Sequence, residues 1–337
     1  MGQLLKPMPL LLFGIILGTG VGWFAHTENY PTVTPLRQSD LSSNTRYQFI
    51  DPLIGLNNSS DSSVSPEYES LQNAVEHFID SEVVAGRLEK ASVNFRDFEV
   101  SVGFVINPDE QFAPASLFKV PTMMGYFKLA EKNPELLSRR LLYTGSTYNT
   151  KESIQSPVQL IPGKSYSTEE LLAHMIKNSD NNAARMLGDY LNTIGSEGVA
   201  NSLVRDLGIT QIEYAQDFIT IRAFALFFRV LYNSTYLSRD MSERALDILS
   251  QTDFKDGLVA GVASNTPVAH KFGEFSLLNP EHLVLKRELH DCGIIYYPKH
   301  PYLLCVMTKG GDFFQLENVI SGISRIVYTT VNNKHAE

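Results

Sequence analysis

The sequence is poor in the residues that build several common classes of site. Only two of its 337 residues are cysteines, which excludes a disulfide-stapled scaffold and a cysteine-rich zinc site. The eight histidines form no close metal-ligand spacing, so no metal ion is expected. Lys and Arg number 28 against 37 Asp and Glu, and this net charge of −9 argues against a nucleic-acid partner. A hydrophobic content of 43% excludes a mostly disordered chain.

An uncharged apolar run stands near the start of the chain. Met8 to Ala25 would span about 27 Å as a helix, close to the ~30 Å of a bilayer core. A cleaved signal peptide is the alternative, but Trp23 is too bulky for the −3 position of a cut after Ala25. We therefore expect residues 1–26 to be a membrane anchor, or else a signal peptide. Because Lys6 precedes the run, the rest of the chain is expected outside the cytoplasm, in the periplasm or at the cell surface.

Residues 27–66 are rich in Ser, Thr, Asn and Pro and have few aliphatic side chains. Such a stretch buries too little apolar area to offset its ordering entropy, so we expect a disordered tether. The folded body would then cover residues 67–334 as one large domain.

The pattern of the body predicts an α+β fold. Apolar residues at helical spacing predict helices at both ends, over Glu67–Glu82 and Phe313–Val331. A mainly helical block from Ser116 to about Ser250 separates segments with strand character. We expect the terminal segments to share one antiparallel sheet, with the middle forming a helical subdomain beside it. The predicted strands are two within 91–106, with a turn near Arg96-Asp97, then Val268–Phe272, Gly293–Tyr297 and Tyr302–Thr308.

Ser116 and Lys119 form a Ser-x-x-Lys pair that opens an apolar run. A serine hydroxyl is a weak nucleophile unless a base lies within hydrogen-bond reach, and a lysine one turn away can be that base if desolvation lowers its pKa. Alone, the pair is expected by chance on the order of once in a chain this long. An N-cap serine and a solvated lysine would also explain it.

Two further short motifs follow along the chain. Ser179-Asp180-Asn181 lies between two predicted helices, where a hydroxyl can relay a proton and an amide can bind a substrate amide; an ordinary N-cap is the alternative. Lys271 and Gly273 lie in a predicted strand. The glycine would let a substrate backbone approach and the lysine would attract a carboxylate, unless it is simply an exposed strand lysine.

As a set and in this order, Ser116-x-x-Lys119, Ser179-Asp180-Asn181 and Lys271-x-Gly273 resemble the motifs of class A beta-lactamases and penicillin-binding proteins. The run from His290 to Ile295 also resembles that family. The resemblance covers residues 67–334. It implies a five-stranded antiparallel sheet flanked by helices, together with an all-helical subdomain.

The resemblance also implies the catalytic roles. Ser116 would be the acylated nucleophile, Lys119 its proton acceptor and Ser179 the donor of a proton to the leaving nitrogen. The backbone N–H groups of Ser116 and Glu274 would form the oxyanion hole, in which each donor is typically worth about 3–4 kcal/mol. No cofactor is implied.

The substrate-binding roles follow in the same way. Asn181 would hold the substrate amide, and Lys271 would position the substrate carboxylate beside Gly273 and Glu274. The substrate would be a small molecule or a peptidoglycan-like peptide.

The sequence departs from the family pattern at the deacylating base. Class A enzymes hydrolyse the acyl-enzyme with a Glu on a loop between the second and third motifs, acting through a water. The Glu-x-x-Leu-Asn segment of that loop is missing here. Glu213 and Asp217 are the nearby carboxylates, and each is either a replacement base or an ordinary loop residue.

The third motif departs as well. Phe272 stands where the family carries Thr or Ser, whose hydroxyl binds the substrate carboxylate, and a phenyl ring cannot hydrogen-bond. Glu274 adds a negative charge at the same place. The segment from Phe275 to His290 looks long for a hairpin loop, and its Lys286 and Arg287 could supply cationic contacts instead.

Cys292 and Cys305 are expected to face each other across two strands, because a turn centred between Pro298 and Lys299 places them opposite one another. A disulfide is allowed outside the cytoplasm. Directly opposed strand pairs rarely suit its geometry, however, so a disulfide is the less favoured of the two states and the redox state stays open.

Together the observations predict a membrane-anchored, monomeric serine hydrolase of the class A beta-lactamase type. It would form an acyl-enzyme on Ser116 and hydrolyse a beta-lactam or related amide, in beta-lactam breakdown or the response to such antibiotics. Two alternatives stay open. One is a penicillin-binding D-Ala-D-Ala peptidase or transpeptidase with slow deacylation, and the other is a non-hydrolytic sensor of beta-lactams or peptidoglycan.

Overall fold

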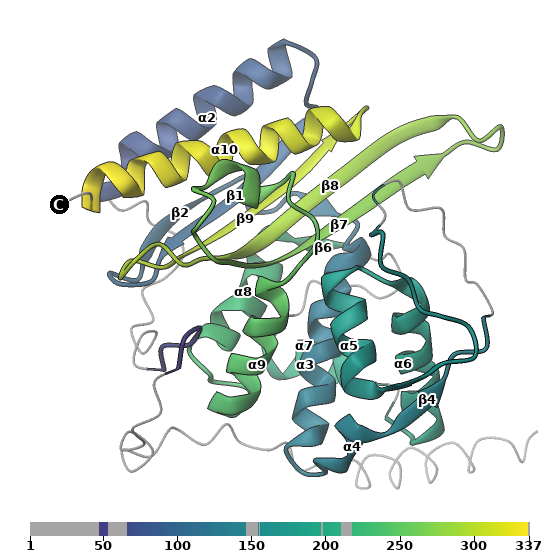
Figure 1. Ribbon diagram of the computed structural model, residues 1–337. Coiled ribbons are helices and arrows are strands. Elements are labelled where there is room, and N and C mark those ends of the chain that lie inside the picture. The colour runs from purple at the N-terminus through teal and green to yellow at the C-terminus, as the bar shows by residue number, and fades with distance from the viewer. Residues whose placement is uncertain are drawn as a thin grey trace, which may run out of the picture. The chain divides into compact units, whose positions relative to one another are not determined.

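A five-stranded antiparallel sheet lies at the centre of the folded body (Figure 1). The computed structural model describes residues 47–52, 66–145, 154, 156–196, 198–209 and 218–335. The strand order β2-β1-β9-β8-β7 joins strands from both ends of the body, which confirms the predicted α+β class and places β7 at one edge. The strands are β1 (Lys90–Asp97), β2 (Val102–Ile106), β7 (Val268–Leu278), β8 (Val284–Ile295) and β9 (Tyr302–Gly310).

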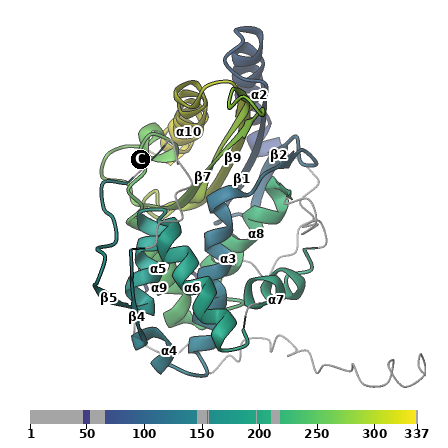
Figure 2. The same ribbon diagram turned by 90° about the vertical axis from the view of Figure 1, so that its right-hand side faces the viewer.

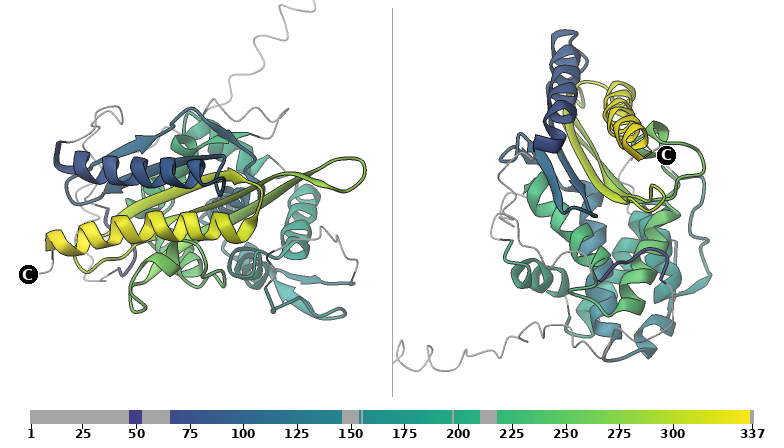
Figure 3. Two further views of the ribbon diagram at one scale, coloured as in Figure 1. Left: turned by 90° about the horizontal axis from the view of Figure 1, so that it is seen from above. Right: turned by 90° about the vertical axis from the view of Figure 1, so that its left-hand side faces the viewer.

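Two helices cover one face of the sheet. α2 (Glu69–Val84) and α10 (Phe313–His335) run side by side across it, one from each end of the body (Figure 3). Their apolar stripes are buried, with Val75 and Ile320 among the fully enclosed side chains. Burial of such a stripe is what drives an amphipathic helix onto a sheet.

The helical block packs against the opposite face (Figure 2). Its core includes the buried side chains of α3 together with Cys292, Ile294 and Met307 from the sheet, so one apolar cluster joins the two parts. The helices are α3 (Lys119–Ala130), α4 (Glu135–Ser138), α5 (Thr168–Lys177), α6 (Asn181–Thr193), α7 (Val199–Asp206), α8 (Ile221–Tyr232) and α9 (Arg239–Ser250). The remaining short elements are η2 (Pro66–Tyr68), η3 (Ala115–Phe118), η4 (Leu258–Gly261), β3 (Gln111–Phe112), β4 (Arg140–Leu142), β5 (Ser165–Ser167) and β6 (Ile219–Thr220). Of these, η2 and η4 pack with α2 and α10.

Two hairpins differ from the sequence prediction. The turn between β1 and β2 was expected near Arg96-Asp97 but lies after Asp97. The Asp97 carboxylate accepts the N–H of Glu99 at 2.8 Å and so begins the turn. The prediction of a long loop from Phe275 to His290 is wrong, because β7 and β8 stay paired as far as Leu278 on β7 and Val284 on β8.

Tyr47 to Pro52, inside the expected tether, lie against α8 and α9. Phe49 is 5% exposed, and its backbone N–H donates to Glu243 at 2.9 Å. Its ring meets Tyr296 edge-on, with centroids 5.1 Å apart. An aromatic side chain gains more by burial than a Ser- or Asn-rich stretch can, so these six residues are ordered and the prediction of a disordered tether is wrong for them.

The candidate anchor, Met8 to Ala25, lies outside the described residues. Within the described ranges, no helix combines the length and the apolar character needed to cross a bilayer.

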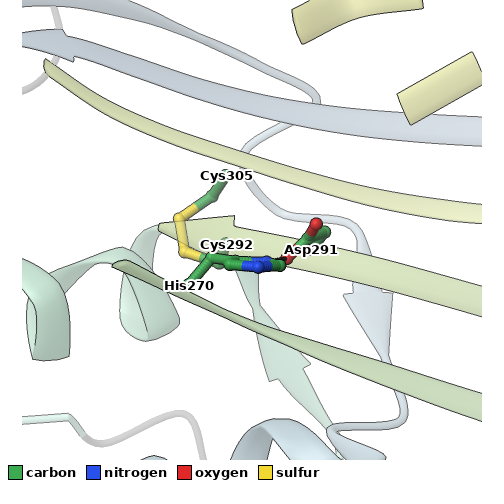
Figure 4. Close-up of a disulfide and its surroundings, with 4 residues drawn as sticks. All are labelled: His270, Asp291, Cys292 and Cys305. Atoms are coloured by element: carbon green, nitrogen blue, oxygen red, sulfur yellow. Dashed lines mark hydrogen bonds and ion pairs between the residues drawn. A yellow bond between two sulfur atoms is a disulfide. The ribbon is translucent and has the colours of Figure 1, made fainter. Parts of the chain in front are cut away.

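Cys292 and Cys305 are paired across β8 and β9 in the predicted register, and the structure joins them in a disulfide (Figure 4). The predicted pairing of the two positions is confirmed, and of the two redox states left open the structure has the less favoured one, the disulfide. Beside them, the ring of His270 on β7 contacts the Asp291 carboxylate of β8 at 2.8 Å, with both side chains fully buried. The second Asp291 oxygen accepts the N–H of Leu258 at 2.9 Å. These links fix β7, β8 and η4 to one another at the level of the third motif.

Candidate active site

The first motif lies on a tight turn between β3 and α3. Ser116 is partly exposed in η3, and the backbone N–H of Lys119 donates to the Ser116 carbonyl as α3 begins. Ala115, directly before the serine, has φ of +46°. This left-handed conformation costs a residue with a Cβ about 1–2 kcal/mol, and such strain persists only where the surroundings impose it.

The second motif forms the turn between α5 and α6. Asp180 caps α6 by accepting the N–H groups of Asn182 and Ala183 at 2.8 and 3.0 Å. Ser179 is 2% exposed and has φ of +53°, so this hydroxyl, too, stands on a strained turn. The N-cap alternative is correct for Asp180, and it leaves the Ser179 side chain available for the cleft.

Three of the predicted polar groups meet at one atom. The Nζ atoms of Lys119 and Lys271 each lie 3.1 Å from Ser179 Oγ. Lys119 also donates to the Ser179 carbonyl and Lys271 to that of Phe272, the latter at 2.9 Å. Both lysines are buried, at 7% and 0% exposure, which overturns the alternatives of a solvated helix lysine and an exposed strand lysine.

Gly273 allows β7 to pack closely against the turn that carries Ser116. A Cβ at this position would lie 3.1 Å from the Leu117 nitrogen and 3.2 Å from the Pro114 oxygen, closer than most side chains tolerate. A glycine therefore lets the edge strand lie directly against η3. This contact brings the backbones of Ser116 and Glu274, the predicted oxyanion donors, onto neighbouring segments.

Phe272 is 5% exposed and stacks on Phe254, with ring centroids 4.4 Å apart. The Lys271 Nζ lies 4.1 Å from the centroid of the Phe272 ring. Glu274 accepts the backbone N–H of Ile154 at 3.2 Å. The side of the site formed by β7 is called the strand wall below, and the side formed by η3, α3 and the turn before α6 is called the helical wall. The strand wall thus carries an aromatic ring and a carboxylate where the family pattern has a hydroxyl.

A cavity of about 320 Å³ opens beside the first motif, and Ala115, Lys119 and Thr122 contribute to its lining. A smaller cavity of about 180 Å³ adjoins Phe272, next to Asn178.

Other predicted residues stand elsewhere. Asn181 is the first residue of α6, two positions after Ser179 in the chain. Lys286 pairs with Glu288 at 3.0 Å and Arg287 with Asp312 at 3.6 Å, so neither is turned toward the cleft. The candidate deacylating bases, Glu213 and Asp217, lie outside the described residues. Nor does the described part of the chain contain three His, Cys, Asp or Glu side chains grouped to hold a metal ion.

Sequence reasoning missed Glu288 and His290, which reach from β8 to the segment before the nucleophile. Glu288 accepts the N–H of Ala113 at 2.8 Å, and the Nε2 of His290 lies 3.1 Å from the Ala113 carbonyl. A signal was present, because Lys286, Glu288 and His290 alternate along the chain and would share one face if the segment were a strand.

Comparison with known proteins identifies a matching family and solved structures with the same fold. Residues 74–331 match the model of a family described as the beta-lactamase enzyme family. Among solved structures, PBP-A matches at 21% identity and a TM-score of 0.64, covering 80% of this chain and all of that one. The extended-spectrum beta-lactamase TLA-3 matches at 18% identity and a TM-score of 0.66, covering 78% of this chain and 98% of that one. A beta-lactamase from Chitinophaga pinensis matches at 19% identity and a TM-score of 0.63, covering 78% of this chain and 100% of that one.

A search of curated proteins finds no match. The solved structures, all below 25% identity, show the shared fold, and the family match spans most of the body. The motif residues described above lie within the matched region, and on these grounds the chain belongs to the beta-lactamase enzyme family.

Proposed function

We propose that this chain is an extracytoplasmic, membrane-anchored serine hydrolase that forms an acyl-enzyme on Ser116 with a beta-lactam or a related amide. The observation that carries the proposal is the convergence of Lys119 and Lys271 on Ser179 Oγ, beside the strained turn that presents Ser116. This arrangement supplies a nucleophile, a buried amine and a hydroxyl in one place, which acyl transfer requires.

In the proposed acylation, Ser116 Oγ attacks the amide carbonyl carbon and its proton passes to the Lys119 amine. Lysine can accept that proton only in its neutral form, which burial and a neighbouring cation favour. The carbonyl oxygen becomes an oxyanion held by the N–H groups of Ser116 and Glu274. As the oxyanion collapses to the ester carbonyl and the carbon–nitrogen bond breaks, Ser179 gives its proton to the leaving nitrogen and takes up the proton held by Lys119, whose Nζ lies 3.1 Å from Ser179 Oγ. Asn181 and Lys271 hold the substrate.

Two related structures support the substrate class. TLA-3 is described as an extended-spectrum beta-lactamase, and a point mutant of PBP-A is described as an acyl-enzyme complex with penicillin G. For this chain the same chemistry is an inference from the site.

Intact-protein mass spectrometry after incubation with a fluorescent penicillin tests the proposal. The wild type should gain one penicilloyl mass located on Ser116, and Ser116→Ala should gain none. Absence of an adduct, together with equal rates of penicillin loss for the wild type and Ser116→Ala, would refute the proposal for this substrate class.

A D-Ala-D-Ala peptidase or transpeptidase is the second candidate, favoured by the missing Glu-x-x-Leu-Asn segment. The lifetime of the adduct separates the two. Return to the free mass within seconds indicates a beta-lactamase, because deacylation is then fast. An adduct that persists for hours indicates a penicillin-binding peptidase.

Membrane anchoring rests on the uncharged run from Met8 to Ala25. The full chain should remain with membranes after alkaline carbonate extraction, whereas a chain lacking residues 1–26 should not. Release of the full chain by carbonate would contradict membrane anchoring.

A further inference from the structure

We infer that Glu288 and His290 act together as a clamp on the backbone of Ala113 and thereby position Ser116 for attack. The two side chains hold both polar groups of one residue: Glu288 Oε2 accepts the Ala113 N–H at 2.8 Å, and His290 Nε2 donates to the Ala113 carbonyl at 3.1 Å. A carbonyl oxygen can only accept, so Nε2 must carry a proton. The inference deepens the proposed function and rests on it.

The clamp is charged and enclosed. Glu288 is 2% exposed and His290 is fully buried. Burial alone would raise the pKa of Glu288, but the contacts with His290, Lys286 and Ala113 lower it to about 2, so the carboxylate is ionised at neutral pH. A buried charge is costly unless its oxygens are well bonded. Here Oε2 accepts the Ala113 N–H and Oε1 lies 3.0 Å from the Lys286 Nζ, so both oxygens of Glu288 have partners.

Ala113 is well placed for such a role. Only Pro114 and Ala115 separate it from Ser116, and Ala115 carries the strained φ of +46°. On the downstream side, the Leu117 N–H donates to the Pro114 carbonyl at 3.0 Å and closes the turn. The backbone of Gly273 packs against the same turn. The clamp supplies the upstream hold, so that the strained turn is fixed on both sides.

The clamp residues are positioning residues, because they contact Ala113 and not the nucleophile. Their removal should therefore slow the acylation step, k2, without weakening the initial binding constant for penicillin. A displacement of about 1 Å at a reacting atom can cost on the order of 100-fold in rate.

The test measures k2 and the binding constant separately, by rapid-quench acylation of the full chain at several penicillin concentrations. We expect Glu288→Ala and His290→Phe to lose about 10- to 100-fold in k2 with binding unchanged. Glu288→Gln and His290→Gln, which keep an acceptor and a donor, should recover most of that loss. Thr308→Val is the matched control, because it removes a buried hydrogen bond to the Leu289 carbonyl of the same strand without touching Ala113.

A second measurement does not depend on penicillin. Hydrogen exchange of peptides covering 111–118 should accelerate at least 10-fold in Glu288→Ala and His290→Phe, and not in Thr308→Val. If both clamp variants match Thr308→Val in k2 and in exchange, the inference is wrong and the contacts serve only stability. If the wild type forms no adduct and consumes penicillin no faster than Ser116→Ala, the proposed function fails, while the exchange data still decide whether the clamp holds the turn.

Discussion

The two walls of the cleft differ in how closely they follow the family pattern. On the helical wall, Ser116, Lys119 and Ser179 all carry the residue types that acyl transfer needs, and Ser179 Oγ lies 3.1 Å from Lys119 Nζ. On the strand wall, Lys271 reaches the same hydroxyl, but Phe272 and Glu274 replace the expected hydroxyl environment. The helical wall therefore keeps the residue types of the family pattern, whereas the strand wall departs from it at the positions expected to meet the substrate carboxylate.

The two walls also differ in how they are held. The helical wall uses local devices, a capped helix and two residues with positive φ. The strand wall is braced by β8, which contacts β7 through the His270–Asp291 pair and is itself joined to β9 by the disulfide. Changes of side chain on the outer face of β7 are therefore compatible with an unchanged strand position.

Lys119→Met should have the largest effect, because it removes the proposed proton acceptor while keeping the side-chain volume. General-base removal costs about 10²- to 10⁴-fold, so we expect at least 10³-fold slower adduct formation, measured by mass spectrometry. Lys128→Met is the control on the same helix, since Lys128 binds Glu131 and the Tyr236 carbonyl away from the cleft. Equal rates for the two variants would contradict the role of the helical wall.

The carboxylate behind the strand wall predicts a pH dependence of stability. The pKa of Glu288 is lowered from 4.5 to about 2, so the folded state holds its proton less tightly than the unfolded state. The resulting stabilisation is present above pH 4.5 and is lost as pH falls toward 2, an effect of about 3 kcal/mol. Denaturant unfolding should show wild type more stable than Glu288→Gln at pH 6, with the gap closing near pH 2. A gap that stays constant with pH would contradict the buried charge pairing.

Much of the fold was predictable because its signals are local. Thr168–Lys177 is a helix with a capping box formed by Ser167 and Glu170, and the register of Cys292 with Cys305 follows from a short turn. One local feature was missed as well. The outer ends of β7 and β8 project beyond the core, with Leu277, Leu278 and Val284 exposed, so no alternation of buried and exposed residues marks them as strands.

The same distinction applies to the site. Motif spacing predicted Ser116, Lys119, Ser179 and Lys271 as site residues. In the structure both lysines contact the Ser179 hydroxyl. The contact of Glu288 with Ala113 joins residues 175 positions apart, and no spacing rule reaches across that distance.

Phe272→Thr should sharpen the comparison by restoring a hydroxyl to the strand wall. A hydroxyl that donates to the penicillin carboxylate should raise the second-order acylation rate about 10-fold, as expected for one hydrogen bond to a charged group. Loss of the ring stacked on Phe254 should also lower the free energy of unfolding by about 2–4 kcal/mol. Phe272→Leu is the matched control, with a similar stability loss and no gain in rate. If the two variants acylate equally, the missing hydroxyl does not limit recognition.

Glu274→Gln should have the smallest effect. Gln keeps an oxygen that can accept the Ile154 N–H, now at 3.2 Å, so the backbone contact survives and only the charge is lost. A carboxylate several ångströms from the substrate carboxylate in a partly exposed cleft opposes binding by about 1 kcal/mol or less. We therefore expect a 3- to 5-fold higher acylation rate, larger at low salt because screening weakens the repulsion. Glu281→Gln, at the tip of the β7–β8 hairpin, should leave the rate and its salt dependence unchanged. A Glu274→Gln rate that is unchanged at every salt concentration would show that the substrate carboxylate does not approach this wall, and the strand wall would then recognise another part of the substrate.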